Sequence, residues 1–421
     1  MVGTAGRTDG RGHGLRLVWR LGLVVAVTTL ATGVVSRSAF AATAVGTPYV
    51  WMDDDAGQYC NGTISTSTSN VDSSKPVVSL LPPSSAVAAG HSHTLALDAS
   101  GAVYACGYSS QGALGTGVAG NSYVPVRASL PPGVVATAVA AGWNDSLALT
   151  TTGAVYAWGL NTYGELGNGT TKDSRLPVQV HLPTGVVAVA IAAGQFHNLA
   201  LTSTGAVYAW GYNGFGQLGD GTATQRSVPV RVHLPKGAIG AAIGCGDDHS
   251  LVATSAGPVY SFGKNTFGQL GDGTTVPSPV PVRVSLPAGV SVTALAAGGV
   301  SPTAKVPEGD YSVAVTSTGA VYAWGADAQG QLGNNSTTDS SVPVLALMPS
   351  GAVAVAVGAG SNFAHVLTTD GNVYFWGAGG TGGSRHLTPY PTTLPHGLHA
   401  VAVSAGPDGE QMAAVFVPNG P

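Results

Sequence analysis

The segment Gly153-Ala-Val-Tyr-Ala-Trp-Gly159 decides the fold, because the chain repeats it at a nearly fixed interval. Close copies begin at Gly101, Gly205, Gly257, Gly319 and Gly371. The starts from 101 to 257 lie 52 residues apart, the step to 319 is 62, and the last step is again 52. A period of about 50 residues is typical of a solenoid or a propeller.

Three further elements recur with the same period. The pattern Ala-Gly-x-x-His precedes each copy, as in 193–201, and Asn-x-x-Gly-Gln-Leu-Gly follows it, as in 213–219. A Pro-Val segment such as 229–233 completes the unit. Frequent Gly and Pro oppose helices, while β-branched runs favour strands. Each unit is therefore predicted to hold four strands, in one unit 187–193, 197–202, 206–210 and 229–233.

The two ends of the chain carry complementary halves of one unit. Residues 49–63 match a third strand and the loop that follows it, and residues 400–417 match a first and a second strand. Pairing these halves would complete one blade and hide two sheet edges. Third strands are apolar on both faces, and neighbouring blades would cover them. We therefore predict an all-β fold over residues 42–421: a seven-bladed β-propeller, four antiparallel strands per blade, one blade closed by the N- and C-terminal strands.

The first 41 residues are predicted to be a signal peptide. Four arginines precede the apolar run 21–35, and Ala39-Phe40-Ala41 provides a small-x-small cleavage site. The alternative is a retained membrane anchor, although the run is short for a span. Cleavage removes five Arg and one Asp, which moves the net charge from −4 to about −8. We expect a secreted monomer, extracellular or on the cell surface, without a membrane segment after cleavage.

The charge pattern argues against a nucleic-acid partner, because such a partner requires clustered Lys and Arg to displace counterions. The three cysteines, Cys60, Cys106 and Cys245, are odd in number and form no CxxC motif. Cys106 and Cys245 stand at apolar positions of the repeat and are predicted to be buried thiols. A bridge from Cys60 stays open, because export would permit one.

The repeated motifs resemble those of the regulator of chromosome condensation (RCC) family, over nearly all of residues 48–417. The resemblance implies a seven-bladed propeller that binds proteins. The eukaryotic founder is a nuclear exchange factor for a small GTPase, but an export signal makes that activity the least favoured reading here. The chain looks like a bacterial secreted member. The architecture is also similar to the propeller-type β-lactamase inhibitor, whose repeats are shorter, so a secreted enzyme inhibitor is the alternative function.

Residues shared by all repeats are expected to build the ring, since each blade solves the same packing problem. His93, His197 and His249 are accordingly predicted to be buried or hydrogen-bonded. Tyr163, Phe215 and Phe267 recur in phase and are predicted to pack on a neighbouring blade. Functional candidates are instead residues that vary between the repeats on the face that we call the top. This face carries the Ala-Gly-x-x-His turns and the loops after the third strands.

The variable turn residues supply the candidate partner-binding site. The pairs within the turns are His91/Ser92, Trp143/Asn144, Gln195/Phe196, Asp247/Asp248, Gly299/Val300, Ser361/Asn362 and Pro407/Asp408. Aromatic residues at turn tips suit a protein interface, although both rings could instead fold over the channel mouth. A ten-residue insert in the fifth turn, near 299–310, breaks the repeat and is either a partner-binding loop or a tolerated surface insertion. We predict partner binding by Trp143, Asn144, Phe196, Asp247, Asp248, Lys305, Glu308 and Asp310.

Enzyme signatures do not appear in the sequence. It holds no HExxH, no GxSxG and no GxxxxGK[ST] motif. We therefore predict no catalytic residues, no metal site and no cofactor. The function expected is a non-catalytic, secreted, protein-binding scaffold whose partner docks on the top face. Asp53-Asp54-Asp55 lacks the spacing of a calcium loop.

Overall fold

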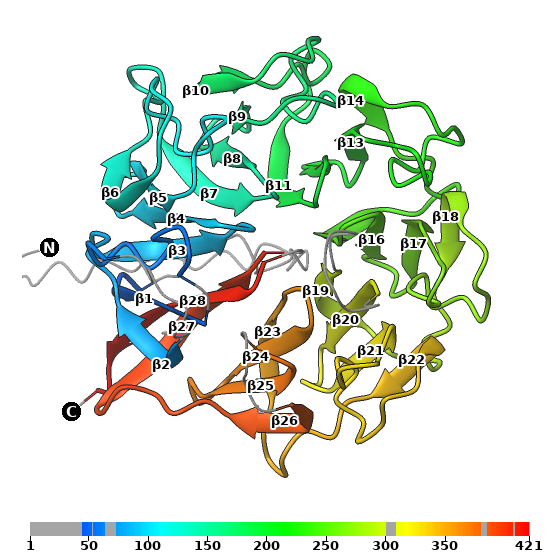
Figure 1. The fold of residues 1–421 in the computed structure, drawn as a ribbon. Helices are drawn as coiled ribbons and strands as arrows, with labels where there is room; N and C mark the ends of the chain where they lie inside the picture. The colour runs from blue at the N-terminus through cyan, green and yellow to red at the C-terminus, as the bar shows by residue number, and fades with distance from the viewer. Residues whose placement is uncertain are drawn as a thin grey trace, which may run out of the picture. The chain divides into compact units, whose positions relative to one another are not determined.

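The computed structural model describes residues 44–52, 54–63, 73–299, 309–379, 385–406 and 409–420. In these ranges, β-strands form seven four-stranded antiparallel sheets arranged as the blades of a ring (Figure 1). This confirms the predicted seven-bladed propeller. The predicted signal peptide, together with Lys305 and Glu308, lies outside the described residues.

The strands recur in the same order in every blade. The first strands, which line the central channel, are β3 (Ser84–Ala89), β7 (Ala136–Ala141), β11 (Ala188–Ala193), β15 (Gly240–Cys245), β19 (Val292–Gly298), β23 (Ala354–Ala359) and β27 (Leu398–Ala405). The second strands are β4 (His93–Asp98), β8 (Asp145–Thr150), β12 (His197–Thr202), β16 (His249–Thr254), β20 (Tyr311–Thr316), β24 (Phe363–Thr368) and β28 (Gln411–Pro418). The third strands are β1 (Thr47–Met52), β5 (Val103–Gly107), β9 (Val155–Gly159), β13 (Val207–Gly211), β17 (Val259–Gly263), β21 (Val321–Gly325) and β25 (Val373–Gly377). The outer, fourth strands are β2 (Ser73–Val78), β6 (Ser122–Arg127), β10 (Ser174–Gln179), β14 (Arg226–Arg231), β18 (Ser278–Arg283), β22 (Ser340–Leu345) and β26 (His386–Pro391).

One blade is assembled from both ends of the chain, as the half-repeats predict. Its strand order is β2-β1-β28-β27, and β1 pairs with β28 from Thr47↔Phe416 to Met52↔Gln411 (Figure 1). We call it the closing blade. The other blades each use four consecutive strands.

The outer strands differ most from the sequence prediction. β12 has the predicted bounds, whereas β14 begins at Arg226, three residues before the predicted start. The register between β13 and β14 shifts between Ala209 and Gly211. Pro229 lies in this irregular stretch. Because Pro lacks an N–H and cannot complete the ladder, it suits an outer edge and also blocks pairing with another chain.

The core consists of contacts between adjacent blades. One cluster joins Leu147 and Val155 of the β7–β10 blade to Ala200 and Trp210 of the β11–β14 blade, and each of these side chains is fully buried or nearly so. Both faces of a blade are therefore covered, which explains strands that are apolar on both sides. The first strands converge on the channel, where mainly small side chains line a cavity of about 80 Å³.

The cysteines correct part of the sequence analysis. Cys60, in the loop after β1, forms a disulfide with Cys106 on β5, so the expectation of a free, buried Cys106 was wrong. The bridge joins the closing blade to the β3–β6 blade. Cys245 is a buried free thiol, as predicted, and burial raises its pKa well above the usual range. It is therefore a poor nucleophile.

Candidate functional site

The top face collects two kinds of connection from each blade. Turns between first and second strands reach it, and so do the loops after third strands, because neighbouring strands run antiparallel. The predicted turn residues Trp143 and Phe196 lie here, between β7 and β8 and between β11 and β12. Their rings contact each other edge to face, with centroids 5.0 Å apart. The structure therefore brings together these two aromatic side chains from adjacent blades.

These two rings belong to a longer series of contacts that we call the aromatic arc. Its members are His91, Trp143, Phe196, Tyr163, Tyr212 and Phe215. In this order the successive ring centroids are 5.7, 5.0, 5.3, 4.9 and 6.3 Å apart. Phe215 is 38% exposed, and the other five side chains are half-buried. The arc crosses the tops of three adjacent blades and presents apolar surface that a partner could cover.

Only part of this arc is predictable from the sequence. Tyr163 packs on Phe196 and Tyr212 of the next blade, in line with the prediction that Tyr163 packs on a neighbour. Tyr212 was missed. It directly follows Gly211 at the end of a third strand, where other repeats carry Leu160, Lys264 or Ala326. Variation at this position is the signal that could have identified it.

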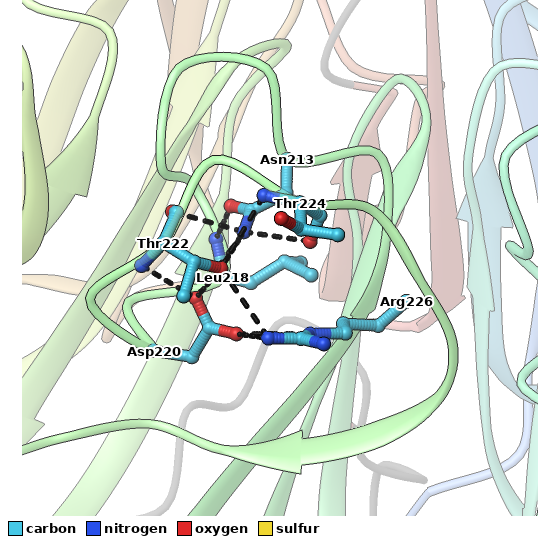
Figure 2. A network of polar contacts seen from close by, with 6 residues as sticks. All are labelled: Asn213, Leu218, Asp220, Thr222, Thr224 and Arg226. Carbon is cyan, nitrogen blue, oxygen red and sulfur yellow. Dashed lines mark hydrogen bonds and ion pairs between the residues drawn. The ribbon is translucent and has the colours of Figure 1, made fainter.

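A polar network fixes the loop that carries Phe215 (Figure 2). Asn213 Nδ2 donates to the carbonyl oxygens of Thr222 and Thr224, at 3.1 and 3.0 Å, and Asn213 Oδ1 accepts from the Leu218 amide at 2.9 Å. Asp220 pairs with Arg226 at 2.8 Å, from the loop to the outer strand (Figure 2). These bonds hold the loop without using Phe215, so its ring stays available at the surface.

Lys264 ends the arc with a positive charge. Its ammonium lies 5.5 Å from the Phe215 ring centroid and 3.3 Å from carboxylate oxygens of both Asp248 and Asp310. Burial lowers the pKa of Lys264, but the two aspartates outweigh burial and raise it. Burial also raises the pKa of Asp310, against the attraction of Lys264. Lys264 is another residue that sequence analysis missed.

The remaining predicted residues are less accessible. Asn144, Asp247 and Asp310 are buried, with 6, 2 and 1% of their surface exposed. Asp248 is largely buried beside Lys264, and its pKa is raised, chiefly by burial. Within the described part of the chain, Trp143, Phe196 and Asp248 are thus the predicted residues that a docked partner could touch.

The repeated histidines connect adjacent blades, at interfaces that we call seams. Nε2 of His93, His197 and His249 lies 2.9, 2.8 and 2.7 Å from the hydroxyl oxygens of Ser146, Ser250 and Ser312 in the next blade. Each serine donates to a loop carbonyl, so its oxygen accepts from the histidine. Burial lowers the pKa of His197 to about 3, so the ring is neutral. The histidines are structural, as predicted.

The seam between the β7–β10 and β11–β14 blades has acidic side chains at positions where other seams carry a histidine and a glutamine. Asp145 takes the place of the histidine and accepts from Asn198 Nδ2 at 2.8 Å, and the same amide donates to the Glu165 carbonyl at 2.9 Å. Glu165 takes the place of a glutamine that the following repeats carry as Gln217 and Gln269. Both acids are buried. We call Asp145, Asn198 and Glu165 the acidic seam.

Within the residues that the structure describes, no group of three or more His, Cys, Asp or Glu side chains is arranged to hold a metal ion. Among the same residues, no helix is long and apolar enough to cross a membrane.

Comparison with known proteins places the chain in a family. Residues 21–311 match the model of the RCC1-like domain, and residues 318–367 match the regulator of chromosome condensation (RCC1) repeat. The ultraviolet-B receptor UVR8 of Arabidopsis thaliana is 31% identical over 70% of this chain and 65% of its own length. The E3 ubiquitin-protein ligase HERC2 of Homo sapiens is 30% identical over 79% of this chain. The chain spans less than two thirds of either relative, and only 7% of HERC2.

Solved structures share the fold at low sequence identity. Prp20p of Saccharomyces cerevisiae, described with its binding to Gsp1p and histones, has a TM-score of 0.78 at 23% identity, covering 91% of this chain and 94% of that one. Human WBSCR16 has a TM-score of 0.75 at 22% identity, covering 89% of this chain and 100% of that one. Together with the family match over residues 21–311, these similarities show that the chain belongs to the family of RCC1-like domains.

Proposed function

We propose that this chain is a secreted, non-catalytic scaffold that binds a protein partner through the aromatic arc on its top face. The observation that carries the proposal is the unbroken series of ring contacts from His91 to Phe215. Half-buried aromatic side chains with Tyr and Trp among them suit the centre of a protein interface.

The charges beside the arc indicate what the partner presents. Asp248, beside Lys264, is an acid of this face that a docked partner could touch, and the net charge of the chain is −4. A partner with apolar side chains over the arc and a basic side chain near Asp248 would complement this surface. The solved relative Prp20p, described with its binding to Gsp1p and histones, supports protein binding as a use of the fold.

Export is supported by two features. The first 41 residues have the pattern of a signal peptide. The Cys60–Cys106 disulfide suits an oxidising compartment, because cytosolic thiols are generally kept reduced. We propose that the exported protein acts as a monomer.

The test is capture of partners from culture medium on three immobilised forms of the protein. These are wild type, Trp143→Ala plus Phe196→Ala, and a control, Val187→Ala plus Ile239→Ala. The control residues are exposed aliphatic side chains on the opposite face. We expect a partner captured by wild type and control and lost by the arc variant. Equal capture by all three forms would refute the arc as the binding surface.

A further inference from the structure

The acidic seam departs from the other described seams at two positions at once. Where three seams pair a histidine with a serine, this one pairs Asp145 with Asn198. In the same seam, Glu165 replaces the repeat's glutamine. Both changes introduce a carboxyl group where the repeat has a neutral side chain. Two such changes in one seam point to a property specific to this part of the ring.

Gln269, at the equivalent position of another repeat, makes a hydrogen bond that Glu165 does not make. Gln269 Oε1 accepts from the Phe267 amide at 2.9 Å, and Nε2 donates to Asp310 in the next blade at 3.0 Å. Glu165 Oε2 makes the first bond, from the Tyr163 amide at 2.8 Å. In the blade next to Glu165, Phe196 stands at the position equivalent to Asp310. Glu165 Oε1 is buried and has no hydrogen-bond partner among the described residues. An ionised Glu165 would thus be poorly solvated.

The surroundings of Glu165 favour its neutral form. Burial raises its pKa to about 7, hydrogen bonds from backbone amides oppose this, and Asp173 adds to it. Burial also raises the pKa of Asp145 well above its ordinary range, although the Asn198 bond lowers it, and Glu165 adds to the rise. Asp145 also interacts with the buried Cys245 thiol, whose pKa is raised chiefly by burial. Among these groups none is a cation, so the backbone amides alone oppose the effect of burial on Glu165.

Glu165 is also connected to the aromatic arc through Tyr163. Its carboxyl group holds the amide of Tyr163, and the Tyr163 ring packs on Phe196 at 5.3 Å. Both rings are half-buried, so water still reaches this part of the face. An apolar partner surface laid over the two rings would remove that water. Removing it disfavours the charged form of an acid beneath the interface.

We propose that docking on the aromatic arc takes up a proton at Glu165, so that the acidic seam makes partner binding stronger in acid than in alkali. This inference rests on the proposed function, because it assigns a regulation to the same surface. By linkage, binding that raises the proton affinity of a group weakens as pH rises through the range in which that group ionises. The weakening is at most about tenfold per pH unit for a single proton.

The first experiment needs no partner. The Glu165 carboxyl carbon is titrated by NMR, and exchange of the Tyr163 amide is compared with that of the Phe215 amide, which makes the same bond to Gln217 at 3.0 Å. We expect titration near pH 7, not near 4.5. As the pH rises from about 4.5 to about 7, the protection of the Tyr163 amide against exchange, relative to that of the Phe215 amide, should fall by up to about tenfold per pH unit. In Glu165→Gln this ratio should stay constant.

The second experiment measures docking with a defined probe. A peptide is selected from a random dodecapeptide library on wild type and counter-selected on Trp143→Ala plus Phe196→Ala. Its affinity is then measured from about pH 5 to about pH 8, for wild type and for Glu165→Gln, which restores the repeat's own residue. We expect the affinity for wild type to fall above about pH 7, and the affinity for Glu165→Gln to change less over the same range.

The outcomes separate the inference from the proposed function. Titration of Glu165 at its ordinary value, or the same pH dependence of affinity in both forms, overturns the proton linkage while the arc remains a binding surface. Failure to obtain any peptide that the arc variant loses overturns the proposed function, and the linkage with it, whatever the titration shows.

Discussion

Cys60 and Cys106 form a disulfide where other seams pack a glycine against an aromatic ring. A Cβ atom added to Gly167 would lie 3.0 Å from Trp210, and one added to Gly271 would lie 2.7 Å from Trp324. Cys60 stands at the glycine position of this contact, and Cys106 stands at the tryptophan position. Cys60 also keeps the left-handed backbone of the glycines, with φ of 56° against 58° at Gly167. A covalent bond thus replaces a packing contact in one seam.

The disulfide should contribute measurably to stability. Cys60→Ala plus Cys106→Ala should lower the free energy of unfolding by about 2–4 kcal/mol, because the bridge closes a long loop of the unfolded chain. Cys60→Gly plus Cys106→Trp should recover part of this loss, because it rebuilds the contact of the other seams. Urea denaturation measures both. Equal stability of the alanine variant and wild type would contradict the assignment.

The tryptophan of a seam contributes one hydrogen bond that can be removed alone. Trp210 Nε1 donates to the Glu165 carbonyl at 2.7 Å, and that carbonyl also accepts from Asn198. Trp210→Phe should therefore cost only about 1 kcal/mol, since the carbonyl keeps a partner. The β15–β18 blade already carries Phe262 at this position. Trp210→Ala is the contrasting variant, with an expected cost of about 3–5 kcal/mol in denaturant unfolding.

The buried histidines should make the ring sensitive to acid. Burial lowers the pKa of His197 from 6.5 to about 3. Between these pH values the unfolded chain therefore binds a proton at His197 that the folded chain does not bind. Stability contributed by His197 is therefore complete above pH 6.5 and is lost as pH falls toward about 3.

His197→Gln isolates this contribution. Gln411 occupies the same position in the closing blade, where its Oε1 accepts from Thr94 at 3.2 Å, so the repeat tolerates the change. Relative to wild type, the variant should gain up to about 1.4 kcal/mol per pH unit on acidification below pH 6.5. Unfolding free energies measured across this range would disprove the assignment if the two curves ran parallel.

Lys264 should be more important for stability than an ordinary surface lysine. Its ammonium faces Asp248 and the buried Asp310 at 3.3 Å each. Lys264→Met leaves Asp310 without its cation and should cost about 3 kcal/mol at neutral pH. Adding Asp310→Asn should recover part of the loss. Lys236→Met, at an exposed lysine, is the control and should be nearly neutral in thermal and denaturant unfolding.

The repeat made the fold predictable, because a fixed period with complementary half-units at 49–63 and 400–417 is compatible with few architectures. The disulfide escaped prediction for a physical reason. Each cysteine replaces one partner of a contact that crosses a seam, and the sequence does not show that the glycine and tryptophan positions touch. Once this contact is known, Cys60 and Cys106 read as a single paired substitution.

A residue of the candidate site was predictable only if it varies between the repeats and also stands at a turn tip of the top face. Trp143 and Phe196 stand out as large rings at variable turn tips, and the structure brings them into contact. Tyr212 and Lys264 follow the glycine that ends a third strand, a position whose orientation toward the top face is visible only after the blades are assembled. Asp310 lies in a variable insert by sequence, yet it is buried against Gln269 and Lys264.

The closing blade sets the order in which the ring can be completed. β28 lies between β27 and β1, so the first strand of the ring acquires this neighbour only when residues 411–418 have been synthesised. Until then, β1 and β2 form only a two-stranded sheet, which is marginal by itself. A nascent chain that has not yet reached residue 411 therefore holds an unclosed series of blades. Ring closure must wait for β28, and a chain that ends before residue 411 lacks the strand that performs it.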